Sequence, residues 1–154
     1  LPQCVDQNID SLLQAKSASC MIMLARPGLG LNTAMAHNIG GLYDVPHGEA
    51  NSIILPYTMR FNLDASADRQ VLIAQAMGID TSNMTNEDAG LAAADGVSQL
   101  CQKLGLPMRL RDVGVPEEGL ELIAAATLHD RGLATNPKQI TDAGPIMSVL
   151  RDAW

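Results

Sequence analysis

The chain has 154 residues, of which 47% are hydrophobic and 18% are charged, which is enough to bury the core of one globular domain. A formal net charge of −7 and a single close basic pair, Arg109 and Arg111, argue against nucleic-acid and anionic-membrane partners, because both require basic patches. The longest apolar run, 20–25, is too short to span a bilayer, for which about 18 residues are needed. We interpret this run, with Cys20, as part of a buried helix.

The composition also indicates the fold class and the compartment. Aromatic residues make up only 3% of the chain, so Leu, Ile, Ala and eight Met must fill the interior, and this favours packed helices over a sheet. Three cysteines are an odd number, and none of them forms a CxxC pair. Reduced thiols in a cytoplasmic protein are therefore expected. We predict a single helical domain over 1–154.

The first half of the chain predicts three helices. Apolar residues with helical spacing cover 6–25, and Pro27 interrupts the pattern. A second helix is expected over 29–40 and a third over 47–61. Pro56 lies inside the third helix and should kink it, because its ring clashes with the preceding turn and it lacks an N–H group.

The second half predicts four more helices, over 63–77, 85–104, 115–129 and 141–154. Gly78 is a typical left-handed stop, and Thr85 is a typical N-cap. Pro116 suits a first helical turn, and Asp142 caps the last helix. No segment alternates like a strand, so the prediction is an all-α bundle of about seven helices.

Two of the three histidines, His37 and His47, stand on either side of a short connection that contains Gly40 and Pro46. A short connection makes the two flanking helices antiparallel neighbours. Both imidazoles should therefore lie at one end of a helix pair.

The residues around this histidine pair carry a specific pattern. The string AHNIGGLYDVPHGEANSIILPYTMRFN resembles the signature AH-x-xG-x-xY-x-xPHG-xAN-x-xLLP-x-xRFN of the iron-containing alcohol dehydrogenase family. Further similar segments follow in the same order: IAQAMGID, KLGLPMRLRDVGVPEEGLELIAAATLHDR, NPK and the closing DAW. The resemblance covers essentially the whole chain.

The resemblance implies a two-domain enzyme, in which an N-terminal α/β domain binds NAD(P) and an all-helical C-terminal domain holds divalent iron or zinc. This chain resembles only the helical domain. GLGLNTAMAH contains G-x-G, but no strand precedes it, so it does not predict a phosphate-binding loop. We expect no cofactor-binding residues in this chain.

The expected metal site is incomplete. The resemblance implies four ligands: an Asp and a His on a helix upstream of the residues present here, and two histidines at the positions of Thr33 and His47. A threonine hydroxyl is a poor ligand for iron or zinc. His47 is thus the only matching ligand, and no metal is predicted. His37 matches a family histidine that lies near the active site.

Candidate site residues follow from the same region. We predict His37 and His47 as catalytic acid–base groups, because imidazole is the side chain that ordinarily titrates near neutral pH. Thr33, Tyr43 and Glu49 are predicted to contact substrate. The alternative for each histidine is an inert, hydrogen-bonded residue near a helix end.

Three functional hypotheses remain. We favour a stand-alone helical domain that lost its nucleotide domain and metal, and that carries out a cofactor-independent acid–base reaction of the lyase, isomerase or cyclase type on a small molecule. The second is a fragment or subunit of an alcohol dehydrogenase completed by another chain with NAD(P) and iron or zinc. The third is a non-catalytic binding module. Bare apolar surface at 20–24 and on the His37 helix predicts a homodimer.

Overall fold

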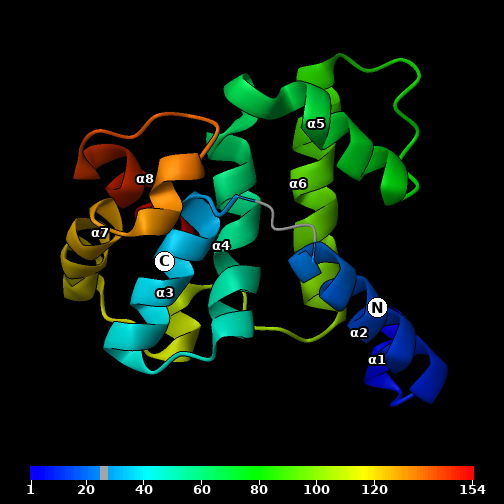
Figure 1. Ribbon diagram of the computed structural model, residues 1–154, viewed down its shortest axis with the longest axis horizontal. Helices are drawn as coiled ribbons and strands as arrows, with labels where there is room; N and C mark the ends of the chain where they lie inside the picture. The colour runs from blue at the N-terminus through cyan, green and yellow to red at the C-terminus, as the bar shows by residue number, and fades with distance from the viewer. Residues whose placement is uncertain (25–27) are drawn as a thin grey trace.

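The computed structural model describes residues 1–24 and 28–154, and these residues contain helices and no strand (Figure 1). The α-helices are α1 (Pro2–Val5), α2 (Ile9–Leu24), α3 (Leu31–Tyr43), α4 (His47–Phe61), α5 (Leu63–Ala76), α6 (Asn86–Lys103), α7 (Leu120–Leu128) and α8 (Ala143–Ala153). Three 3-10 helices, η1 (Leu110–Val113), η2 (Glu117–Gly119) and η3 (Arg131–Thr135), lie between them. The all-α prediction is confirmed.

The described residues contain one α-helix more than the expected seven, because α1 (Pro2–Val5) lies before the first expected helix, 6–25, which begins only at Ile9. Residues 6–8 separate α1 from α2, and Gln7 in this turn has a φ of 56°. A left-handed residue cannot continue a right-handed helix, so the first expected helix starts later than its apolar spacing indicates. Pro27, the expected interruption after this segment, lies outside the described residues.

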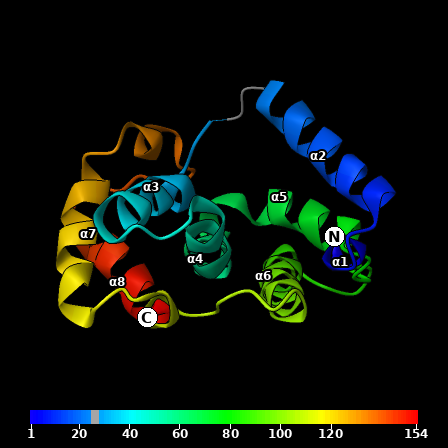
Figure 2. The same cartoon turned by 90° about the horizontal axis from the view of Figure 1, so that it is seen from below.

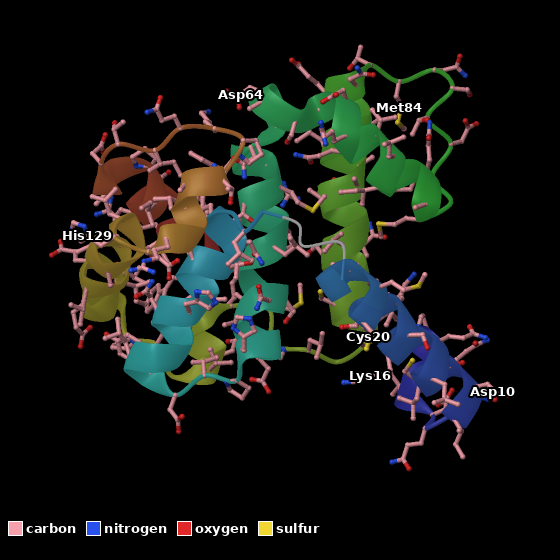
Figure 3. All side chains as sticks on the ribbon, viewed as in Figure 1. Asp10, Lys16, Cys20, Asp64, Met84 and His129 are labelled. Atoms are coloured by element: carbon pink, nitrogen blue, oxygen red, sulfur yellow. The ribbon has the colours of Figure 1, made fainter. Side chains whose placement is uncertain are left out.

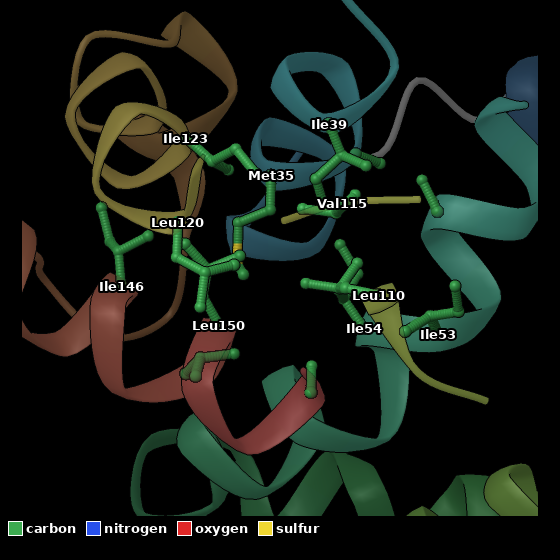
Figure 4. Packing of buried hydrophobic residues seen from close by; sticks show 14 of the residues in the cluster. Met35, Ile39, Ile53, Ile54, Leu110, Val115, Leu120, Ile123, Ile146 and Leu150 are labelled. Atoms are coloured by element: carbon green, nitrogen blue, oxygen red, sulfur yellow. The ribbon is translucent and has the colours of Figure 1, made fainter. Parts of the chain in front are cut away.

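The main core lies where α3, α4, α7 and α8 meet (Figure 4). On α8, Ile146, Val149, Leu150 and Ala153 recur at the spacing of one helix face, and all four are buried. They meet Met35 and its neighbours from α3, together with residues of α4 and α7. This core is the rigid support beneath the α3–α4 pair.

A second, smaller cluster joins α4 to α5 and α6. Its buried members are Met59, Ala74, Ala93 and Ala94. Gly90 on α6 faces Leu63 so closely that a Cβ there would collide with the leucine side chain. Small residues therefore let α5 and α6 approach each other.

The α1–α2 segment forms an arm beside this body (Figure 2). Neither α1 nor the part of α2 from Ile9 to Ile22 contains a buried residue, and Cys20 is exposed. The prediction that Cys20 is buried is therefore wrong. The prediction was based on the apolar character of 20–25, but an apolar sequence does not by itself provide a packing partner.

Local signals in the sequence mark several helix ends. Thr85 accepts a hydrogen bond from the Asp88 backbone N–H, Asp142 accepts one from Gly144, and Gly78 has a φ of 81°. Helix α4 continues through Pro56 to Phe61. Non-helical φ and ψ angles occur in the next helix, α5, at Ser66. No helix in the described part of the chain is long and apolar enough to cross a membrane.

Candidate functional site

The connection between α3 and α4 places two imidazoles together. Asp44 follows the last residue of α3, has a φ of 54° and donates its N–H to the Gly40 carbonyl. Pro46 then precedes α4. His37, in the middle of α3, and His47, the first residue of α4, have ring centroids 5.5 Å apart and planes inclined by 20°. The rings are stacked, so the two imidazoles lie close together, as expected of residues that flank a short connection between antiparallel helices.

A carboxylate holds one of these rings. His37 Nδ1 lies 3.1 Å from Asp130 Oδ2, with 44% of the histidine side chain and 18% of the aspartate side chain exposed. The second oxygen of Asp130 accepts a hydrogen bond of 2.7 Å from the Gly132 N–H and thereby caps η3. Both carboxylate oxygens are engaged, so the position of Asp130 relative to His37 is fixed.

Asp130 is the functional candidate that the sequence did not reveal. It lies 93 residues after His37, and no local pattern connects the two. The only local signal is the spacing from Asp130 to Gly132, which is typical of an aspartate that caps a turn. His129, the residue before it, is exposed at the end of α7 (Figure 3).

Amide side chains form a second set of contacts beside the imidazoles. Asn51, one turn after His47, donates to the His47 carbonyl at 2.7 Å and accepts from Asn32 of α3 at 2.6 Å. Thr58 in turn donates to Asn32 at 3.3 Å. Hydrogen bonds between these side chains therefore connect α3 to α4.

The other predicted residues lie around the pair at different depths. Thr33 is half-buried on α3, one turn before His37, and Glu49 is half-buried in the first turn of α4. Tyr43, the last residue of α3, lies against Gly119, where a Cβ would collide with its hydroxyl. Tyr43 therefore also packs the base of the site onto the start of α7.

The thiol nearest to this helix pair is chemically quiet. Cys101 on α6 is 7% exposed, and its Sγ lies 3.8 Å from the Ser52 carbonyl of α4. Burial raises the pKa of the Cys101 thiol, which keeps it protonated. A protonated thiol is neither a good nucleophile nor a good metal ligand.

The residues present do not fit a divalent metal ion on their own. Within 1–24 and 28–154 no group of three or more His, Cys, Asp and Glu side chains is arranged to hold one. His37 Nδ1 is engaged by Asp130, and the hydroxyl of Thr33 stands where the resemblance implies an imidazole. His47 and the free Nε2 of His37 offer two imidazole ligands at most, fewer than the three or four that zinc takes in proteins.

A dinucleotide does not fit the described residues either. The phosphate-binding fingerprint requires a strand, a Gly-rich turn and a helix, and the described part of the chain contains no strand. The G-x-G at Gly28 and Gly30 leads into α3 without that context.

Comparisons with known proteins agree on one relationship. A profile described as the Fe-containing alcohol dehydrogenase family, C-terminal, matches residues 5–154. The chain is 40% identical over 127 residues to lactaldehyde reductase of Escherichia coli (strain K12), which covers 82% of this chain and 33% of that protein. It is 40% identical over 126 residues to 1,3-propanediol dehydrogenase of Citrobacter freundii, with 82% and 32% covered. The chain spans about a third of the length of these relatives.

Solved structures show the same architecture. A crystal structure of 1,3-propanediol oxidoreductase superimposes with a TM-score of 0.78 at 36% identity, covering 81% of this chain and 32% of that one. An alcohol dehydrogenase from Oenococcus oeni gives a TM-score of 0.78 at 33% identity over the same shares of the two chains. In both cases the helical bundle matches about a third of a longer protein.

Proposed function

The chain belongs to the Fe-containing alcohol dehydrogenase family and corresponds to its C-terminal part, and from that premise we propose that it forms the substrate-binding helical part of an alcohol–aldehyde oxidoreductase. Relatives carry names such as lactaldehyde reductase, 1,3-propanediol dehydrogenase and NAD-dependent methanol dehydrogenase, so the proposed substrates are short alcohols and their aldehydes. Because this chain spans about a third of those relatives, residues outside it must bind the nicotinamide that supplies or accepts the hydride.

The observation that carries the proposal is the Asp130–His37–His47 arrangement. A carboxylate only accepts hydrogen bonds, so its contact with Nδ1 favours a proton on that nitrogen and leaves His37 Nε2 as the working atom. The stacked His47 ring lies beside it at 5.5 Å. A substrate oxygen next to His37 Nε2 would exchange its proton there, while the aspartate stabilises the charged ring.

A chimera tests the proposal. Residues 5–154 replace the matching C-terminal third of E. coli lactaldehyde reductase, whose remaining part supplies the nucleotide-binding residues, and lactaldehyde reduction is followed by NADH absorbance. We expect measurable turnover, and we expect His37→Asn to lower kcat by about 10²-fold, the scale of a lost general acid or base. Asn38→Ala, on the same helix, serves as the matched control and should keep the activity.

The result has a clear negative form. A chimera that folds by circular dichroism, elutes like the parent enzyme and binds NADH, yet reduces neither lactaldehyde nor a short diol's aldehyde, would reject the oxidoreductase assignment. Activity that survives His37→Asn would reject only the role given to His37.

A second candidate function is supported by Thr33. A hydroxyl at this position weakens the expected metal site, whereas His37 and His47 on an exposed surface can still move protons. The chain alone would then enolise small hydroxycarbonyl compounds without cofactor. Deuterium uptake from D₂O into dihydroxyacetone, followed by NMR, checks this. Uptake that disappears in His37→Asn favours the acid–base function, and no uptake above the buffer rate rejects it.

Metal titration separates the two candidates further. Purified chain is dialysed against Zn²⁺ and measured by elemental analysis, with Thr33→His and, as control, Asn38→His. We expect little bound zinc in the native chain and an increase in Thr33→His alone, because that change adds a third imidazole beside His37 and His47. Stoichiometric zinc in the native chain would show that its residues can hold the ion and would contradict the conclusion that they do not fit one.

A further inference from the structure

Two asparagine side chains join α3 to α4 directly beside the imidazole pair. Asn32 Nδ2 donates to Asn51 Oδ1 at 2.6 Å, and both side chains are half-buried. Asn32 is the second residue of α3, and Asn51 lies one turn into α4. The hydrogen bond therefore crosses directly from α3 to α4.

Neighbouring bonds fix the direction of both amides. Asn51 Nδ2 donates to the His47 carbonyl at 2.7 Å, which leaves its Oδ1 for Asn32. Thr58 Oγ1, on a residue that is 2% exposed, donates to Asn32 Oδ1 at 3.3 Å, which leaves Asn32 Nδ2 for Asn51. In each amide, one polar atom is held by a residue of α4 other than its bridge partner, and the other polar atom forms the Asn32–Asn51 hydrogen bond. An amide flip would place two acceptors or two donors face to face.

This bridge determines the register of the two helices in a way that apolar packing does not. Dispersion contacts are non-directional and tolerate small slides, whereas a hydrogen bond weakens steeply outside its distance and angle. A slip of one helical turn moves a residue by about 5.4 Å. The His37 and His47 centroids are 5.5 Å apart, so such a slip would remove the stack.

We propose that Asn32 and Asn51 are positioning residues that hold α3 and α4 in the register that stacks His37 on His47. The bridge stands one residue from Thr33 and one turn from His47, the two positions at which the family resemblance implies ligands of a metal ion. In this chain the described residues do not fit such an ion, and amide hydrogen bonds join the two helices at the same level. The inference concerns the site of the proposed function.

The test uses the full chain and needs no turnover. ¹³C,¹⁵N-histidine-labelled protein is crystallised or studied by NMR, and the separation of the His37 and His47 rings is measured in Asn32→Leu and Asn51→Leu, which remove the bridge. Asn51→Asp keeps an acceptor for Asn32 but loses the donor to the His47 carbonyl, so it separates the bond between the helices from the bond within α4. Asn38→Leu is the matched control, because Asn38 is a half-buried amide of the same helix that bonds only to Ala34 of its own helix.

We expect the two bridge-breaking variants to lose the ring stack while their helical content stays native, and we expect Asn51→Asp and the control to keep it. An unchanged ring separation in Asn32→Leu would overturn the proposal, as would loss of the stack in Asn38→Leu. If Asn51→Leu does not fold, Asn32→Leu and Asn51→Asp still decide. An inactive chimera with an intact, Asn32-dependent stack would reject the proposed function and leave this inference standing.

Discussion

The body of the molecule and its N-terminal arm use similar residues to opposite effect. Leu120 of α7 is fully buried, whereas Leu13 of α2 is 60% exposed. On α8 the apolar residues share one face, which the core covers. On α2 they are spread around the helix, and none from Ile9 to Ile22 is buried. Charged and polar residues, among them Asp10 and Lys16, stand between the apolar residues of α2, so its sequence is typical of a helix that is covered on part of its surface.

The largest expected effect compares one leucine from each region. Leu120→Ala should lower the free energy of unfolding by about 2–5 kcal/mol, because it removes buried methyl groups and leaves a cavity. Leu13→Ala should change it by less than about 0.5 kcal/mol, because the side chain is already largely in water. Urea unfolding followed by circular dichroism measures both. Equal losses would show that the arm is packed in solution and would remove the contrast.

The second prediction asks what covers the arm. We expect the chain to form a homodimer through α2, because exposed apolar side chains favour association. Leu13→Glu combined with Ile22→Glu should halve the mass found by sedimentation equilibrium. Leu122→Glu, on an equally exposed leucine of α7, is the control and should leave the mass unchanged. A native chain that stays monomeric at high concentration would contradict the expectation.

Helices were predictable where the signal is local. Thr85, Asp142 and Gly78 fix helix ends through atoms a few residues away, so reading the sequence finds them. The burial of α2 was not predictable in this way. It depends on partners elsewhere in space, and the same apolar run that predicts a buried helix describes an exposed one here.

The candidate site likewise combines one contact that the sequence predicts with contacts that only the tertiary structure shows. The proximity of His37 and His47 follows from a short connection between two helices, and the sequence contains that information. Asp130 reaches His37 only because α7 and η3 fold back onto α3. The Asn32–Asn51 bridge depends on the crossing of two helices at one particular register. Neither contact has a sequence spacing that marks it.

The third prediction concerns a defect inside the core. Thr127 is fully buried, and its hydroxyl has no hydrogen-bond partner among the described residues. Thr127→Val keeps the shape and removes the polar group, so it should raise the free energy of unfolding by about 1 kcal/mol. Ser17→Ala, on the exposed arm, should change it very little. A loss of stability in Thr127→Val would indicate that the hydroxyl has a partner, such as an ordered water.

The smallest effect is expected at an exposed ion pair on the surface of the body. Lys138 Nζ lies 2.8 Å from Asp64 Oδ2 at the start of α5, and this hydrogen bond holds the pKa of the Asp64 carboxyl below its usual range. A lowered folded-state pKa means that the stabilisation is present above the ordinary carboxyl pKa and is lost as the pH falls through the lowered one. Asp64→Asn should therefore be slightly less stable than the native chain near pH 7 and equal to it in strong acid.

Salt distinguishes this contact from packing. Because both side chains are exposed, screening at about 1 M salt should erase the small difference between Asp64→Asn and the native chain at pH 7. The difference between Leu120→Ala and the native chain has no charge to screen and should persist. Unfolding midpoints of the three proteins at low and high salt check both statements. A salt-insensitive loss in Asp64→Asn would mean that Asp64 acts through the first turn of α5 rather than through Lys138.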